Sequence, residues 1–541
     1  MINNFLTYFI NLKYNLTTAT YLSIVFLAAE QLFRLSHSLL TFNLDFHKIS
    51  VQFAITFIAS LLVSKRAIYS IFIFISFLML MQFLHFNYYA TWIFPLEYIL
   101  VFTKFTETLS TFSTVLEITL IPLLIISIMS LFIFFILKKM NDKRVTIPYL
   151  SFILILFLAF LPLRVYIKEN SKKGARPNIE VSTMVNGIET LGFLFGRIIP
   201  QKISGNSDLT QEVKPTPKII MDSPDVNIVV IMGESLTHSM MSLYGAKDNT
   251  TPRLDALSKD TGFTKQIAFT SGIVADVALP SFFNMLYQPD SREQILSTNT
   301  CLFKMAKDNG FETYFYSAQS RIGLAYIKSY MCFNSVEHYL DGTHDTKKKK
   351  QNALDQVLLD RLELVDFTKP SFIVLHQIGS HSPYGLRYPE SFKKFKSTGN
   401  RYDHGAYKNS ILYTDYIVSE IIKRLKEKTD KLTYVFFTSD HGEGTDEHAG
   451  HGNLKLASNF EVPFILYRIN DTQGYSPNSL KQKYTSHYEI SKLVADRLGY
   501  DISSMKQDKQ KHYICGKDLS GVAGCLNIQM KGDIILEQKI K

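Results

Sequence analysis

Cysteine is scarce in this chain: only four of the 541 residues are Cys, and no two of them form a Cys-x-x-Cys pair. A small disulfide scaffold and a metal or redox motif of that spacing are therefore excluded. Gly (26 residues) and Pro (17) are too few for collagen, and no internal repeat is visible. Because hydrophobic residues make up 46% of the chain and charged residues only 20%, disorder is excluded as well.

Long hydrophobic runs occur only in the first 167 residues. Crossing the hydrocarbon core takes about 20 apolar residues, and five runs reach or nearly reach that length. They lie at 18–38, 48–64, 67–86, 115–137 and 148–167. We therefore predict a transmembrane domain of five helices over 1–167, a linker with an interfacial helix over 168–218, and a globular domain over 219–541.

Basic residues predict how the chain sits in the membrane, because Lys and Arg are enriched in cytoplasmic loops. Lys65 and Arg66 lie between the second and third runs, and the segment 138–144 between the fourth and fifth contains four more basic residues. Both loops are predicted to be cytoplasmic, so the aromatic loop 87–114 and the globular domain lie outside. The net charge of +10 fits these loops and a domain above anionic lipid, and needs no nucleic-acid partner.

The globular domain alternates short apolar strands with helices, which is typical of an α/β fold with a largely parallel sheet. The predicted strands are 226–232, 313–316, 372–376, 434–438 and 463–467. In such sheets, binding sites form beyond the carboxyl ends of the strands. Polar clusters follow three of these strands, at 233–235, 376–381 and 439–443.

These clusters contain metal-ligand side chains. Asp440 and His441 are adjacent at one strand end, Glu234 follows the first strand, and His381 and His451 lie in other loops. Two carboxylates and three imidazoles suit one zinc ion, or two metals that clamp a phosphoryl group. A helix N-cap is the alternative role for Glu234.

All four cysteines lie in the predicted exported domain: Cys301, Cys332, Cys515 and Cys525. An even number in an oxidising compartment indicates two disulfides. The local pairing, Cys301 with Cys332 and Cys515 with Cys525, is one of three possible pairings, and buried free thiols are the alternative.

Several motifs in this domain carry a family resemblance. They are 230–235 (Val-Ile-Met-Gly-Glu-Ser), 242–245 (Ser-Leu-Tyr-Gly), 250–254 (Thr-Thr-Pro-Arg-Leu), 375–383 (Leu-His-Gln-Ile-Gly-Ser-His-Ser-Pro), 439–443 (Ser-Asp-His-Gly-Glu) and 451–452 (His-Gly). The domain resembles the alkaline phosphatase/sulfatase superfamily. With its predicted anchor, the chain resembles the phosphoethanolamine transferases of Gram-negative inner membranes, which include lipid A-modifying and mobile colistin-resistance enzymes.

The resemblance implies a multi-pass inner-membrane enzyme, a monomer with its catalytic domain in the periplasm. A threonine would take phosphoethanolamine from phosphatidylethanolamine and pass it to lipid A, another part of lipopolysaccharide or a glycan. Glu234, Asp440 and His441 would hold a zinc ion with that nucleophile. His381 and His451 would bind the phosphoryl group or a second zinc ion.

The nucleophile is where the sequence departs from the family pattern, which reads Ser-Cys-Gly-x-x-Thr with a Pro five residues after the Thr. Aligned on Gly272 and Pro280, the nucleophile position holds Ala275. Three explanations stay open: an engineered Thr→Ala substitution, a natural pseudoenzyme, or use of Thr270 or Ser271 instead. We favour the first, because the other metal-ligand residues are intact.

Substrate contacts follow from the same resemblance. Gln319 and Ser320 occupy a strand end where related enzymes carry an Asn-Gln-Ser-like segment, and they would hydrogen-bond the ethanolamine or phosphate. Thr103 and Glu107 have the spacing of a lipid-binding pair, although the polar residue that precedes the pair in the family is Ile99 here. An ordinary interfacial Glu is the alternative for Glu107. A phosphoglycerol transferase and a non-catalytic pseudoenzyme that binds lipid or zinc are the alternative functions. Sulfatase chemistry is not expected, because no Cys/Ser-x-Pro-x-Arg sequence for formylglycine is present.

Overall fold

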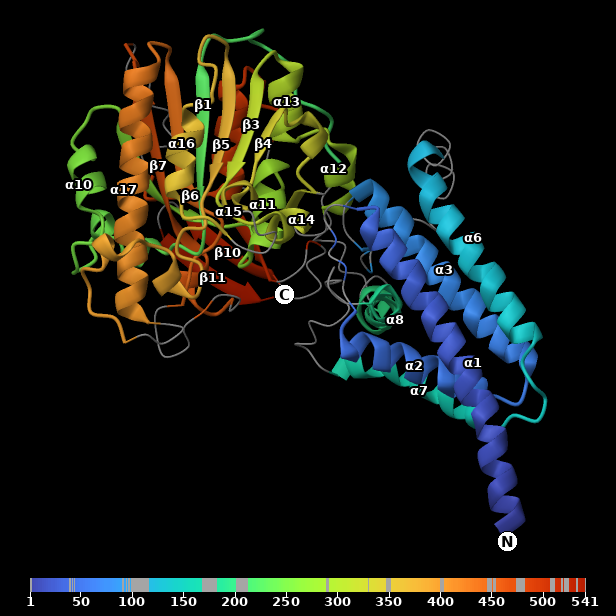
Figure 1. Cartoon of the computed structure of the whole chain (residues 1–541). Coiled ribbons are helices and arrows are strands. Elements are labelled where there is room, and N and C mark those ends of the chain that lie inside the picture. Colours follow the sequence, from blue (N-terminus) through green and yellow to red (C-terminus); the bar gives the residue numbers. More distant parts are fainter. Residues whose placement is uncertain are drawn as a thin grey trace. The chain divides into compact units, whose positions relative to one another are not determined.

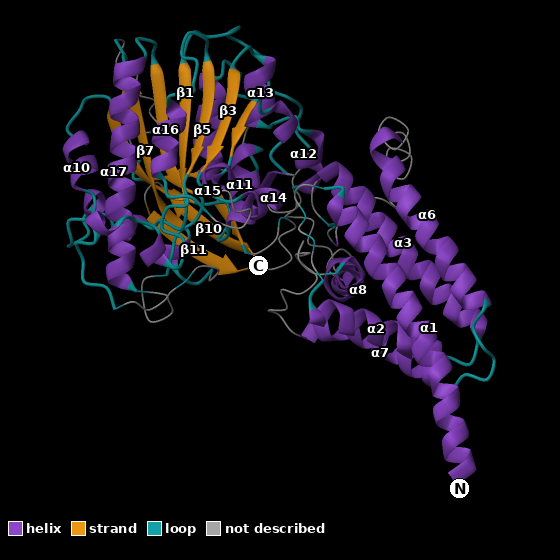
Figure 2. Cartoon of the chain, viewed as in Figure 1, coloured by secondary structure: helices purple, strands orange, loops and turns teal. Residues whose placement is uncertain are grey.

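The structure is a computed structural model of the chain and divides into two compact units, residues 1–205 and 206–541 (Figures 1 and 2). It describes all residues except 1, 38–39, 41, 43, 90–91, 94, 96–97, 99–115, 168–181, 201–212, 289–290, 329, 347–351, 399–402, 445–449, 451–453, 473–481, 506–510, 517–518, 520–524, 532–533 and 541.

The first unit is helical (Figure 2). Its long helices are α1 (Ile2–Leu35), α2 (Phe46–Ser60), α3 (Lys65–Tyr89), α6 (Leu116–Lys138) and α7 (Leu150–Ile167). Within the described residues, three helices are long and apolar enough to cross a membrane: α1, α3 and α6. The apolar parts of α2 and α7 are shorter, so the count of five spans stays a prediction. Helix α1 begins well before the predicted run, because helical structure continues through the more polar residues before position 18.

Arg144 shows that a charge in a predicted cytoplasmic loop has a structural role. Its side chain is buried and donates hydrogen bonds to the carbonyl groups of Ser60 (3.1 Å), Leu62 (2.7 Å) and Val63 (3.1 Å), at the end of α2. Carbonyl groups at a helix C-terminus lack intrahelical partners and carry partial negative charge. The guanidinium therefore caps α2.

The predicted interfacial helix is α8 (Thr183–Phe193), followed by a π-helical turn, Leu194–Ile198. It packs within the first unit, and a Cβ on Gly187 would lie 3.3 Å from Leu78 of α3. Its N-terminus meets Glu30 of α1, whose Oε2 accepts hydrogen bonds from the amide and hydroxyl of Thr183, both at 3.2 Å. The other oxygen of Glu30 pairs with Arg34 at 3.0 Å. Helix α8 is thus held by a buried carboxylate and by close packing.

The second unit contains an eight-stranded sheet in the order β4-β3-β5-β1-β6-β7-β2-β8. The strands are β1 (Asn227–Gly233), β2 (Phe263–Phe269), β3 (Glu312–Ser317), β4 (His338–Leu340), β5 (Ser371–His376), β6 (Thr433–Ser439), β7 (Glu461–Ile469) and β8 (Tyr484–Ser486). Strand β1 pairs in parallel with β5 and β6, whereas β7 is antiparallel to both neighbours. The five predicted strands are all present. Sequence reasoning did not identify β2, β4 and β8 or the direction of β7.

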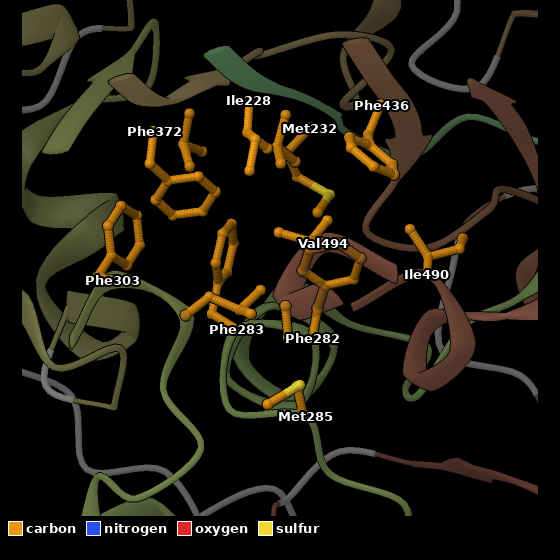
Figure 3. Packing of buried hydrophobic residues seen from close by; sticks show 14 of the residues in the cluster. Ile228, Met232, Phe282, Phe283, Met285, Phe303, Phe372, Phe436, Ile490 and Val494 are labelled. Carbon is orange, nitrogen blue, oxygen red and sulfur yellow. The ribbon is translucent and has the colours of Figure 1, made fainter. Parts of the chain in front are cut away.

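Alternate residues of β1 face opposite hydrophobic layers. Ile228 and Met232 pack with Phe282 and Phe283 of α11 (Ala275–Phe283) and with α13 (Leu302–Asp308) and α18 (His487–Arg497) (Figure 3). On the other face, Val229 and Ile231 pack with α16 (Gln356–Leu362) and α17 (His404–Lys428), which runs along the strands in Figure 1. The shorter helices are α10 (Pro252–Leu257), α12 (Arg292–Ser297), α14 (Arg321–Lys328) and α15 (Gly342–Thr346). Burial on both faces is typical of a largely parallel sheet.

A second sheet near the C-terminus has the order β11-β10-β9, with β9 (Lys511–Cys515), β10 (Cys525–Lys531) and β11 (Ile534–Ile540). Cys515 and Cys525 lie opposite each other in the ladder and form a disulfide, and Cys301 pairs with Cys332. The backbone of Cys515 also bonds to the loop before α11: its N–H donates to Ser271 (2.9 Å), and its carbonyl accepts from Ile273 (3.1 Å). The small sheet therefore supports that loop.

Candidate metal site

Two carboxylates and one imidazole meet where β1 and β6 end. Gly233 and Ser439 are paired in the sheet, so the residues that follow them, Glu234 and Asp440, leave the sheet side by side. The Nε2 atom of His441 lies 3.4 Å from Glu234 Oε1 and 3.4 Å from Asp440 Oδ2. One ligand atom from each of the three side chains falls within 4.8 Å of the others, and all three are buried. The structure brings these three predicted metal ligands together.

The hydrogen bonds around Asp440 and His441 orient both side chains. Asp440 Oδ1 accepts from the amides of Ser235 (3.1 Å) and His441 (2.6 Å). Its Oδ2 is buried and has no hydrogen-bond partner among the described residues. His441 Nδ1 donates to the carbonyl of Gly442 at 2.9 Å, so Nε2 is the ring nitrogen that faces the two carboxylates. A buried carboxylate oxygen and an imidazole nitrogen at one point fit a zinc ion.

Glu234 is held by its neighbours in the same way. Its Oε1 accepts a hydrogen bond from the hydroxyl of Ser235 (2.8 Å), and its Oε2 accepts one from Gln319 Nε2 (2.9 Å). Gln319, a predicted substrate residue, therefore orients Glu234 in this structure. Ser320, also a predicted substrate residue, donates its amide N–H to Asn352 Oδ1 at 2.7 Å.

The electrostatics of the three side chains favour a cation. Burial and the charge of Glu234 raise the pKa of Asp440 to about 8. Burial opposes the charged form of His441, but the two carboxylates raise its pKa to about 10. Burial would also raise the pKa of Glu234, but the hydrogen bond and charge of His441 hold it well below its usual range. Because ionising Asp440 beside Glu234 is costly, a divalent metal would stabilise both side chains in their charged form.

The loop after β5 approaches Glu234 closely and carries His381. The amide of Ser380 donates to the carbonyl of Glu234 at 2.9 Å. Gly379 has φ +49°, and a Cβ there would lie 2.8 Å from the carbonyl oxygen of Glu234, so only glycine fits. His381 Nδ1 donates to the carbonyl of Ser382 at 2.6 Å, and the charge of His381 lowers the pKa of Glu234. His381 thus lies near the cluster without belonging to its three closest ligands.

Sequence reasoning missed the residue that holds this loop. Asp355 is fully buried and accepts hydrogen bonds from the amides of Ile378 (2.7 Å) and Gly379 (3.1 Å) and from Gln377 Nε2 (3.3 Å). Burial raises its pKa to about 7. Nothing in the sequence around Asp355 signals this role, because its partners are more than twenty residues away.

The loop between β2 and α11 contains the nucleophile position. Ala275 begins α11, and its methyl group packs against the core rather than offering a reactive atom. The hydroxyl of Thr270, an alternative nucleophile, is buried and donates to the carbonyl of Gly272 at 2.8 Å. The amide of Ser271, the other alternative, donates to Nδ1 of His487 at 3.4 Å. His487 is the second residue that sequence reasoning missed; burial lowers its pKa to about 3.

Three predicted site residues lie outside the described part of the chain: His451, Thr103 and Glu107. Their roles stay predictions.

Comparison with known proteins places the second unit in a family. Residues 226–500, half of the chain, match the family model described as sulfatase. Among curated proteins, the chain is 24% identical over 307 residues to a Kdo(2)-lipid A phosphoethanolamine 7''-transferase of Salmonella typhimurium, covering 54% of this chain and 53% of that protein. It is 27% identical over 311 residues to phosphoethanolamine transferase EptA of Helicobacter pylori, covering 51% and 55%. The chain thus spans about half the length of the curated relatives that it matches.

Solved structures give weaker matches. The C-terminal periplasmic domain of EptC from Escherichia coli, in complex with zinc, aligns with a TM-score of 0.47 and 23% identity over 57% of this chain and 94% of that chain. The integral membrane protein EptA from Neisseria meningitidis aligns with a TM-score of 0.45 and 15% identity over 89% and 95%. The family match rests on the sequence, and by it this chain belongs to the sulfatase family.

Proposed function

We propose that this protein is built to transfer phosphoethanolamine from phosphatidylethanolamine to an acceptor of the bacterial envelope, and that Ala275 makes the present chain inactive. The buried cluster of Glu234, Asp440 and His441 carries the proposal, because it offers a metal site at the carboxyl ends of two adjacent strands. The curated relatives, which are named phosphoethanolamine transferases, supply the substrate class.

Zinc is the proposed cofactor, held by Glu234, Asp440 and His441. Asp440 Oδ2, which has no hydrogen-bond partner among the described residues, and His441 Nε2, which lies 3.4 Å from it, would be two of its ligand atoms. When bound, zinc lowers the pKa of a nearby hydroxyl and offsets negative charge on phosphoryl oxygens. His381, with its Nδ1 committed to Ser382, would contact the phosphoryl group through Nε2, or hold a second zinc ion.

The covalent step requires a hydroxyl at position 275. With Thr there, Oγ would attack the phosphorus of phosphatidylethanolamine and lose its proton. An Oγ–P bond forms, the bond from phosphorus to the diacylglycerol oxygen breaks, and diacylglycerol leaves with a proton. An acceptor oxygen then displaces the threonine and takes the phosphoethanolamine. Alanine has no oxygen for the first attack, so neither step proceeds.

The membrane unit fits a lipid donor. Its three apolar helices would hold the chain in the inner membrane, and the second unit would act on the periplasmic side, close to the headgroups. The acceptor would be lipid A, another part of lipopolysaccharide or a glycan.

A non-catalytic role is the second candidate, and Ala275 is the observation that favours it. In that case the chain would bind zinc or lipid without turnover, as a sensor or assembly partner. The hydrogen bonds that orient Asp440 and Glu234 do not involve residue 275, so metal binding would not depend on a nucleophile at that position.

Restoring the hydroxyl tests the proposal. The full chain, Ala275→Thr and Ala275→Val would be reconstituted in vesicles that contain fluorescent phosphatidylethanolamine or fluorescent phosphatidylglycerol. Valine has the shape of threonine without its oxygen, so it is the matched control. We expect diacylglycerol release from phosphatidylethanolamine by Ala275→Thr alone.

Release from phosphatidylglycerol would instead support a phosphoglycerol transferase. No release from either lipid by Ala275→Thr, with zinc bound, would support the non-catalytic role.

A further inference from the structure

His487 joins the two parts of the candidate site. It is the first residue of α18, directly after the edge strand β8, and it is 1% exposed. Its Nε2 donates to the carbonyl of Ser439 at 3.0 Å, and its Nδ1 accepts from the amide of Ser271 at 3.4 Å. Ser439 ends β6 and precedes Asp440, whereas Ser271 lies in the loop that leads to position 275.

The two hydrogen bonds define the chemical state of the ring. A carbonyl only accepts, so Nε2 carries a proton; an amide N–H only donates, so Nδ1 is bare. The imidazole is therefore neutral, with its proton on Nε2. Lysine and arginine have no acceptor atom, and a carboxylate has no donor, so neither type of side chain could make both contacts.

The ring also contacts the helix that begins at position 275. The rings of His487 and Phe282, on α11, pack edge to face with centroids 5.4 Å apart and planes at 84°. One side chain thus touches the end of β6, the loop before α11 and α11 itself. The hydrogen bonds between Cys515 and Ser271–Ile273 hold the same loop by its backbone, on the side of the small sheet.

We propose that His487 is a positioning residue, which sets the place of residue 275 relative to the metal ligands that follow β6. The inference rests on the proposed function, because a fixed distance between nucleophile and metal matters only where a reaction occurs between them. A misplacement of about 1 Å at a reacting group lowers turnover by about a hundredfold. His487 does not touch substrate or metal; it acts through Ser271 and Ser439.

A graded set of substitutions separates the two contacts. His487→Asn keeps a polar atom near Nδ1 for Ser271, His487→Gln keeps one near Nε2 for Ser439, and His487→Phe keeps only the ring. Tyr488→Phe, on the same helix, removes a hydroxyl that bonds to Met505 and serves as the matched control. All four would be made in the full chain, with and without Ala275→Thr.

Turnover by the Ala275→Thr forms gives the first readout. We expect kcat to fall at least about tenfold in His487→Phe and less in the two conservative variants, with KM for phosphatidylethanolamine and bound zinc unchanged. Tyr488→Phe should keep the full kcat. An unchanged kcat in His487→Phe would overturn the proposal.

A second readout does not need activity. Nitrogen NMR of histidine-labelled chain with Ala275 should show signals of a neutral ring, protonated at Nε2, that are missing from the spectrum of His487→Phe. Cadmium NMR of the metal-substituted chain should show a shifted line in His487→Phe and an unchanged line in Tyr488→Phe. If Ala275→Thr is inactive, the proposed function fails, and these spectra still decide whether His487 sets the geometry. The proposal would be contradicted if the signals lost in His487→Phe belonged to a ring protonated at Nδ1, or if the cadmium line did not move.

Discussion

The candidate site has two parts: the strand ends that carry Glu234, Asp440 and His441, and the loop that leads to position 275. The two parts differ in which functional groups are present. At the strand ends, the ligand side chains and the hydrogen bonds that orient them are present. In the loop, the backbone is held by Cys515 and His487, but the side chain at 275 offers no reactive atom. Under the proposed function, this loop would place a nucleophile that alanine cannot supply, so metal binding and turnover should be separable.

The largest expected effect comes from removing a cluster ligand. Asp440→Asn should lower zinc affinity by more than about a hundredfold, since loss of even an outer-shell partner of a zinc site costs about 10–100-fold. Competition with a fluorescent zinc chelator measures the change.

Asp415→Asn is the matched control for Asp440→Asn. Asp415 is also buried, but it accepts hydrogen bonds from the amides of Arg253 and Leu254, which lie elsewhere in the unit. Equal losses of zinc affinity in the two variants would mean that the cluster is not the zinc site.

Loosening the loop should lower the stability of the second unit without changing its zinc affinity. Replacing Cys515 and Cys525 together by Ser removes the disulfide in the small sheet, and we expect the second unit to lose about 2–3 kcal/mol of unfolding free energy. Zinc affinity should stay within about twofold, because the loop residues supply no cluster ligand. Denaturation with and without zinc measures both quantities. A loss of zinc affinity as large as that in Asp440→Asn would contradict the view that the loop and the metal ligands are independent.

Gln319 tests whether the support of the cluster matters. Gln319→Leu removes the donor to Glu234 Oε2, and zinc affinity should fall by about 10–100-fold. Gln294→Leu is the control, because Gln294 is equally buried but bonds to Thr300. If Gln319→Leu kept full zinc affinity and lost only headgroup binding, the substrate role predicted from the sequence would replace the supporting role.

The smallest expected effect comes from a helix cap. Asp403 caps α17 by accepting from the amide of Ala406 at 3.0 Å, and Asp403→Ala should cost about 1 kcal/mol without changing zinc affinity. Although burial opposes it, hydrogen bonds hold the pKa of Asp403 below its usual range. The ionised cap is therefore fully stabilising above the unfolded-state pKa of Asp, and its contribution decreases as pH falls below that value. Urea denaturation of Asp403→Ala and Asp403→Asn at two pH values measures it; equal pH dependence in all forms would contradict this.

The sequence predicts the centre of this site better than its surroundings. Strands β1, β5 and β6 are recognisable as short apolar runs, and their carboxyl ends meet in a parallel sheet, so Glu234, Asp440 and His441 follow from local pattern and topology together. The direction of β7 and the pairing of β2 with β8 depend on partners far along the chain. Asp355 and His487 were missed for the same reason: each bonds to backbone groups that only the folded chain brings near.

Mass spectrometry of the chain with Ala275→Thr tests the central claim most directly. After incubation with phosphatidylethanolamine and zinc in the absence of acceptor, the protein would be digested and its peptides searched for added phosphoethanolamine. The account predicts the adduct on the residue at position 275 in Ala275→Thr and no adduct in the unchanged chain or in Ala275→Val. An adduct on Thr270 or Ser271, or any adduct in the unchanged chain, would contradict it.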